Sequence, residues 1–102
     1  MTVVEFFNNG ELLEGFEVSG HSDDSAEEGE DIICAAVSSA VYMAANTITD
    51  VICQEADIKV EDGYLYLKTE STSDVQTILK GLKLHLISLS QDYPKNIYVK
   101  NI

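Results

Sequence analysis

The alternation of apolar and polar residues predicts a chain rich in short strands. Five segments have this character, and they are residues 2–7, 12–19, 58–61, 64–68 and 97–100. The first two flank the turn signal Asn8-Asn9-Gly10, so they are expected to pair as an antiparallel hairpin. The next two flank Asp62-Gly63, a dipeptide that favours a type I′ turn between paired strands.

A second pattern, with apolar residues three or four positions apart, predicts two helices. One runs from Asp31 to about Asp50, and the other begins at Ser73 and ends before Tyr93-Pro94. Gln76 stands at capping-box spacing from Ser73, and His85 is expected to be a surface or interface side chain of the second helix. The apolar stripes of the two helices are Ile33, Val37, Val41, Ala44, Ala45 and Ile48, and then Val75, Ile78, Leu79, Leu82, Leu86 and Leu89.

The predicted order of elements is therefore ββαββαβ. This order indicates an α+β fold of two layers, in which both helices pack on one mainly antiparallel sheet. The chain of 102 residues is expected to be a single domain, 1–102, because its length allows one hydrophobic core and little more. A hydrophobic content of 45% with a single proline favours a globular fold over disorder.

Charge narrows the choice of partners. Eighteen acidic residues against six basic ones give a formal charge of −12, which disfavours direct binding to nucleic acid because phosphates require the opposite sign. An acidic surface attracts basic partners, although the same charge also serves solubility alone. The first residues lack the basic region and apolar run of a signal peptide, and we expect no membrane-spanning segment and no membrane partner. A cytoplasmic location follows as an expectation.

The two cysteines are expected to be free thiols in that reducing compartment, and their spacing indicates no metal site or other cofactor. Cys53, close to the end of the first helix, is expected to be structural. Cys34 is different, because it begins an alanine-rich helix directly after an acidic loop, residues 22–30, that follows His21. If Asp31 caps the helix, Cys34 lies at the third helical position, where the unpaired N–H groups and the positive end of the helix dipole favour a thiolate.

Three more residues are compatible with a site formed by His21 and Cys34. Gly20 and Gly29 allow the backbone to reverse on either side of the loop, so that His21 can turn back toward Cys34. Ser38 lies one helical turn beyond Cys34 on the same face. Residue types alone favour a plainer interpretation over a catalytic site. In that interpretation Cys34 is a small core residue and His21 is a solvated one.

A resemblance reverses that order. Gly20-His21, followed by Gly29-x-Asp31-Ile32-Ile33-Cys34-Ala35-Ala36-Val37-Ser38, resembles the signature of the ribosomal-processing cysteine protease family (Prp, also called YsxB-like). The resemblance implies a small homodimeric protease that removes the N-terminal extension of a large-subunit ribosomal protein, cutting after a phenylalanine in a short apolar motif. The partner implied is a ribosomal protein precursor with a basic N-terminal tail.

Carried over by position, the resemblance implies that Cys34 is the nucleophile and His21 the catalytic histidine. It also matches Asp31 to the acidic residue just ahead of the family's cysteine. In this chain the role of Asp31 is either to cap the helix or to orient His21. Related sequences often carry a second glycine or an aromatic residue after Gly-His, where this chain has Ser22-Asp23-Asp24. The loop is expected to be a lid that closes on substrate or a solvated segment.

A different class of function competes with the protease. The chain could be a non-catalytic, acidic, dimeric module that binds a basic ribosomal protein or assembly factor, with Cys34 as an ordinary core residue. The rate of thiol alkylation discriminates between the two, because an activated Cys34 reacts faster than an ordinary thiol and a buried one does not.

Overall fold

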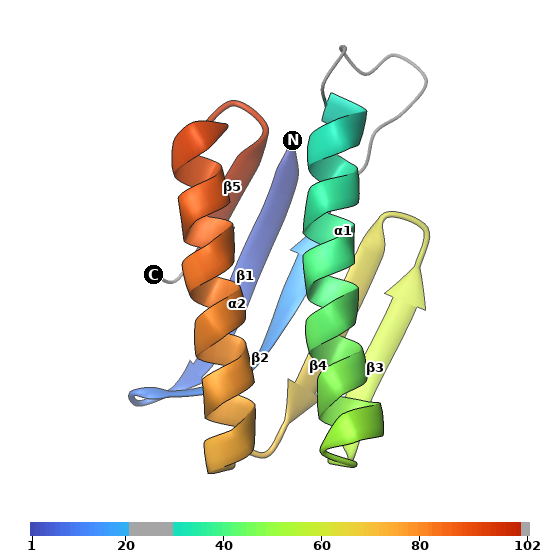
Figure 1. The fold of residues 1–102 in the computed structure, drawn as a ribbon, viewed down its shortest axis with the longest axis vertical. Helices are drawn as coiled ribbons and strands as arrows, with labels where there is room; N and C mark the ends of the chain where they lie inside the picture. Colours follow the sequence, from blue (N-terminus) through green and yellow to red (C-terminus); the bar gives the residue numbers. More distant parts are fainter. Residues whose placement is uncertain (21–29, 101–102) are drawn as a thin grey trace.

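The computed structural model describes the backbone of residues 1–20 and 30–100, together with their side chains except those of Glu30 and Asp31. The elements follow the predicted order (Figure 1). They are β1 (Thr2–Asn9), β2 (Leu12–Ser19), α1 (Glu30–Asn46), η1 (Thr47–Val51), β3 (Ala56–Glu61), β4 (Tyr64–Thr69), α2 (Ser73–Asp92) and β5 (Ile97–Lys100). The unpredicted element, η1, is a short π-helix that continues α1.

The five strands form one sheet in the order β3-β4-β2-β1-β5. Every neighbouring pair is antiparallel except β1 and β5, which run parallel with Thr2 opposite Ile97. Both helices lie side by side on the same face of this sheet (Figure 1). The predicted α+β fold of two layers is confirmed.

The core lies between that face and the two helices. All six residues of the apolar stripe predicted for the first helix are buried. In α2 the predicted Val75, Leu79, Leu82 and Leu86 are buried, and Ile78 and Leu89 are partly buried against the core. The helical periodicity therefore identified the buried faces correctly, because only one side of each helix meets the sheet.

The first helical segment is long and strongly apolar. The segment Ile32–Val51 covers 20 residues with a mean hydropathy of 1.5, enough to cross a membrane by length and composition alone. The expectation that no segment approaches a membrane-spanning length was therefore wrong on those two criteria. The buried stripe of this segment packs on the sheet, and the core helix of a globular protein passes the same test.

The β3–β4 turn differs from the expected type, and the β1–β2 turn begins later than expected. Gly63 has a φ of 72°, but Asp62 before it has no positive φ, so the β3–β4 turn is not type I′, which requires a positive φ at both residues. In the first hairpin β1 continues through Asn9 and the turn begins at Gly10, with a φ of 65°. A register shift between Phe7 and Asn8 adds one residue to the β2 side of this hairpin.

Gln76 does not form the capping box that its spacing suggested. The helix N-cap is Thr72, whose hydroxyl accepts a hydrogen bond from the N–H of Val75 at 3.3 Å. The buried side chain of Gln76 instead accepts from the N–H of Leu13 at 2.8 Å and donates to the C=O of Leu13 at 2.6 Å. The pairing of β2 with β4 begins only at Gly15, so this amide takes the place of a missing strand residue beside Leu13.

Replacing Gln76 with alanine is expected to lower the free energy of unfolding by about 3 kcal/mol, because it leaves two buried backbone groups without partners. Urea denaturation measures this loss. Thr77→Val is the matched control, since the exposed hydroxyl of Thr77 donates only to the preceding turn, and a change of about 0.5 kcal/mol or less is expected there. Equal losses in the two variants would contradict the role assigned to Gln76.

Candidate active site

Cys34 lies in the second turn of α1. The helix begins at Glu30, so Asp31 belongs to its first turn and is not the N-cap, and Cys34 is the fifth helical residue instead of the third. Because the effect of the helix dipole falls off within the first turn, Cys34 lies farther from the positive end of α1 than the sequence suggested. The side chain of Asp31 lies outside the described residues, and so do Gly29 and His21.

The sulfur of Cys34 has one close polar neighbour among the described residues. Thr2, the first residue of β1, places its Oγ1 3.5 Å from Cys34 Sγ, within hydrogen-bonding distance for sulfur. Thr2 is only 3% exposed, whereas Cys34 is half-buried. A reactant can therefore approach the thiol, while its hydroxyl neighbour stays enclosed by the fold.

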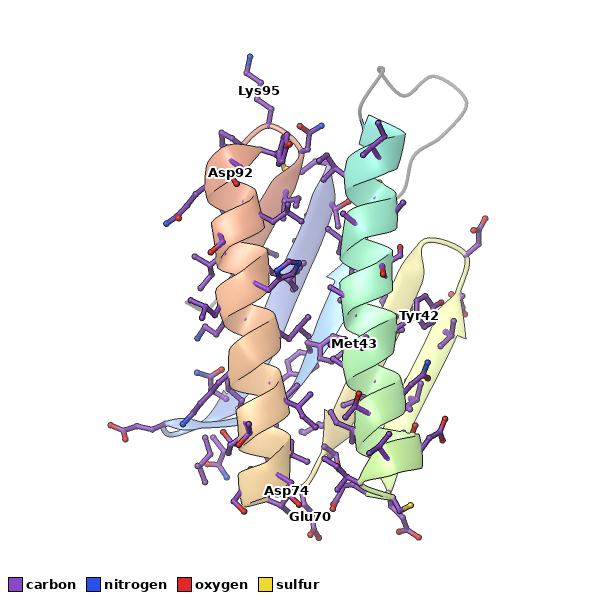
Figure 2. The ribbon with its side chains drawn as sticks, viewed as in Figure 1. Tyr42, Met43, Glu70, Asp74, Asp92 and Lys95 are labelled. Atoms are coloured by element: carbon purple, nitrogen blue, oxygen red, sulfur yellow. The ribbon has the colours of Figure 1, made fainter. Side chains whose placement is uncertain are left out.

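A cavity of about 80 Å³ opens beside Cys34 between α1 and the sheet. Its apolar wall consists of buried residues, Val18, Val37, Val41 and Leu65. Its remaining described lining is Thr2, Gly20, Cys34, Ser38, Tyr42, Glu61, Gly63 and Tyr64. Figure 2 shows Tyr42 extending from α1 toward β3 and β4. The cavity thus suits an apolar group, with polar side chains at its edge.

Gly20 brings the end of β2 into this cavity. It has a φ of 100°, and a Cβ at this position would lie 2.3 Å from the carbonyl oxygen of Met1 and 3.1 Å from the Cα of Thr2. Only a residue without a side chain allows β2 to finish so close to the start of β1. The residue that precedes His21 is therefore held against the segment that contacts Cys34. Ser38, also named from the sequence, lines the same cavity and is exposed.

The edge of the cavity is acidic. The hydroxyl of Tyr64 donates a hydrogen bond to Oε2 of Glu17 at 2.7 Å. This hydrogen bond to a carboxylate, with burial and the charge of Glu17, raises the pKa of Tyr64 to about 12, so its phenol stays protonated at neutral pH. Glu61 lines the cavity beside it. A substrate that carries positive charge near the scissile bond is attracted to such an edge.

Cys53, for which the sequence predicts a structural role, directly follows Ile52, the C-cap of η1. Its thiol is exposed, and the residue has a φ of 62°, in the left-handed region that favours glycine. This conformation ends the helical segment after η1, where a glycine is the usual residue. An alkylation experiment on Cys34 therefore needs Cys53 removed, because an exposed thiol reacts as well. His85 is exposed on α2, as predicted.

The sequence analysis did not name the residues that distant strands contribute to the site. Thr2 and Tyr64 meet α1 only because β1, β2 and β4 are adjacent in the sheet. One feature of the sequence could have indicated Thr2. It is a polar residue at the first inward-facing position of a strand whose other inward-facing residues, Val4 and Phe6, are apolar. Within the described part of the chain, no group of three or more His, Cys, Asp or Glu side chains could hold a metal ion.

Comparisons with known proteins find relatives among the cysteine proteases. A family model described as cysteine protease Prp matches residues 1–98. The ribosomal processing cysteine protease Prp of Bacillus subtilis is 32% identical over 92 residues, which cover 82% of this chain and 81% of that protein. The Staphylococcus aureus protein of the same name is 29% identical over 84 residues, which cover 78% of each chain.

Solved structures show the same fold. The S. aureus ribosomal processing protease Prp in complex with a substrate peptide matches with a TM-score of 0.87 at 24% identity over 98% of both chains. The same protease with a covalently linked product peptide matches with a TM-score of 0.83 at 25% identity over 97% of both chains. A Streptococcus mutans protein matches with a TM-score of 0.84 at 25% identity, over 98% of this chain and 92% of that one.

Proposed function

The chain belongs to the cysteine protease Prp family, and from this premise we propose that it removes the N-terminal extension of a large-subunit ribosomal protein, with Cys34 as nucleophile and His21 as base. It is a cysteine protease, a hydrolase that acts on peptide bonds. The observation that carries the assignment of residues is that Cys34 and Gly20, the neighbour of His21, line one cavity. Membership of a protease family favours this function over a non-catalytic binding module.

In the proposed reaction His21 accepts the proton of the Cys34 thiol or pairs with a thiolate that is already formed. The thiolate attacks the carbonyl carbon of the scissile bond, and the carbonyl oxygen takes the negative charge. The N–H groups of the first turn of α1, which have no partner within the helix itself, are the donors proposed for this oxyanion. Protonated His21 then gives its proton to the leaving amine, and water hydrolyses the thioester.

The cavity supports an apolar side chain on the substrate. Its wall of buried valine and leucine side chains suits the phenylalanine that the family resemblance implies at the cleavage point. A cavity that binds benzene measures about 150 Å³, so a phenyl ring needs more room than the 80 Å³ present here. Tyr42 is 43% exposed, and an outward rotation of its ring would widen the cavity at little cost.

Charge supports the rest of the substrate assignment. A chain with a formal charge of −12 and with Glu61 beside the site favours a peptide rich in lysine, such as the basic tail of a ribosomal protein precursor. We place the reaction in the cytoplasm and without direct contact to nucleic acid. A homodimer belongs to the same proposal, and sedimentation velocity of the purified protein tests it.

Peptide cleavage tests the proposed function directly. The reduced protein is incubated with a peptide that spans the extended N-terminus of the ribosomal protein from the same organism, and the products are identified by mass spectrometry. We expect a single cut after the phenylalanine of the apolar motif, and a peptide with alanine at that position should be cut at least about tenfold more slowly. An intact phenylalanine peptide after prolonged incubation would refute the proposal.

A further inference from the structure

We infer that Thr2 is a positioning residue of the reaction, whose hydroxyl holds the sulfur of Cys34 and stabilises it as a thiolate. The inference rests on the proposed function for the role of Cys34. The contact itself is a separate observation, because Thr2 Oγ1 and Cys34 Sγ lie 3.5 Å apart across the boundary between the sheet and α1.

The backbone of Thr2 is held on two sides. Its N–H donates to the carbonyl oxygen of Asn96 at 2.8 Å, which continues the parallel pairing of β1 with β5. On the other side the missing side chain of Gly20 lets the end of β2 close against Met1 and Thr2. A β-branched side chain on a fixed strand backbone has few rotamers open to it. The hydroxyl of Thr2 is therefore presented to the sulfur from a fixed point.

A hydroxyl at this position has little structural value on its own. Thr2 faces the core on the same side of β1 as Val4 and Phe6, and it is 3% exposed. A buried hydroxyl is costly unless it forms a hydrogen bond, and a neutral thiol is a weak donor and a weak acceptor. Valine, which has the same shape, would serve packing better here. The polar residue gains its value if the sulfur is charged, because a thiolate is a strong acceptor.

The direction of the hydrogen bond follows from the protonation state of Cys34. With a thiol, either atom can be the donor. Once the proton has moved to His21, only the hydroxyl of Thr2 can donate, and its bond to the thiolate becomes charge-assisted. No covalent bond changes at Thr2, and its proton stays on oxygen throughout. Its role is to donate a hydrogen bond to the reacting sulfur and to keep that sulfur beside the cavity.

Alkylation of Cys34 by iodoacetamide tests the inference, in a Cys53→Gly background that leaves one thiol. At about pH 6, Thr2→Val is expected to slow alkylation about tenfold, and the difference should shrink at about pH 10, where even an ordinary thiol reacts as thiolate. Thr2→Ser keeps the hydroxyl and should react within about threefold of the parent. For peptide cleavage by Thr2→Val, the loss should fall on kcat, with KM changed by about twofold or less.

Thr69→Val is the matched control, because Thr69 is also a buried strand threonine but donates to the carbonyl oxygen of Glu55. It should alkylate like the parent. Equal alkylation rates of Thr2→Val and the parent at about pH 6 would overturn the inference, and so would an equal loss at both pH values, which would indicate altered access. If Thr2→Val does not fold, Thr2→Ala repeats the test with a smaller side chain. Alkylation measures the effect of Thr2 on the Cys34 thiol even in a protein that cuts no peptide. Failure of the inference about Thr2 is therefore distinguishable from failure of the proposed function.

Discussion

Replacing Cys34 with alanine should lower kcat/KM for peptide cleavage by at least about 10⁴-fold and leave the fold intact. The sulfur is the atom that bonds to the substrate in the proposed reaction, and the remaining groups of the site cannot substitute for it. The cost to stability should be about 1 kcal/mol, because a half-buried residue loses one atom and Thr2 loses its hydrogen-bond partner.

Two variants make this result specific. Cys34→Ser retains an oxygen to pair with Thr2 but is a much weaker nucleophile, so it should be folded and equally inactive. Cys53→Gly removes the other thiol and should keep full activity, since Cys53 lies on the surface outside the cavity. Cleavage is followed by mass spectrometry and folding by circular dichroism. A Cys34→Ala protein that still cleaves at half the parent rate would remove Cys34 from the mechanism.

The second large effect is expected at Gly20. Gly20→Ala should lower the free energy of unfolding by more than about 3 kcal/mol, and it should reduce cleavage at least about tenfold even at temperatures where the variant is folded. The added Cβ would lie 2.3 Å from the backbone oxygen of Met1, so the ends of β1 and β2 must separate. That movement displaces Thr2 from Cys34 and shifts the residue that leads into His21.

Two other glycines distinguish the effect of the backbone clash from the effect of a positive φ alone. Gly10 also has a positive φ, of 65°, but a Cβ there would meet no atom within 4 Å, so Gly10→Ala should cost only about 1 kcal/mol of backbone strain. Gly81 lies inside α2, also without a neighbour within 4 Å, and Gly81→Ala should stabilise the protein by about 0.5–1 kcal/mol. Urea denaturation measures all three. A loss at Gly20 no larger than that at Gly10 would mean that the close approach of the two strands is not needed.

Local periodicity was sufficient to predict the elements and most of the core. Strands and helices are set by patterns within a few residues, and the sides that carry Val37 or Leu82 meet the single sheet in the way that an amphipathic helix requires. The π-helical end of the first helix was not predictable by this means. The type of the β3–β4 turn was also missed, because Asp-Gly is compatible with more than one turn and the twist of the paired strands decides between them.

The site was predicted less completely, since its chemistry depends on pairs that are distant along the chain. Cys34 and Gly20, which line one cavity, could be named from the sequence because a helix start and a strand end are local features. The contact of Thr2 with Cys34 joins residues 32 positions apart, and that of Gln76 with Leu13 joins residues 63 apart. Such contacts follow from the order of strands in the sheet, which no local pattern specifies. For the same reason, capping-box spacing predicted that Gln76 would bond to the start of its own helix, whereas it bonds to Leu13.

The parallel pairing of β1 with β5 has a consequence for biosynthesis. The carbonyl of Asn96 that fixes Thr2 belongs to a segment that the ribosome makes more than 90 residues later. In a nascent chain, Thr2 cannot be fixed beside the sulfur of Cys34 until this late segment has left the ribosome. Contacts between residues so far apart in the sequence also form slowly. If Thr2 has the role inferred above, the sulfur of a partly made chain lacks the fixed hydroxyl that the finished fold provides.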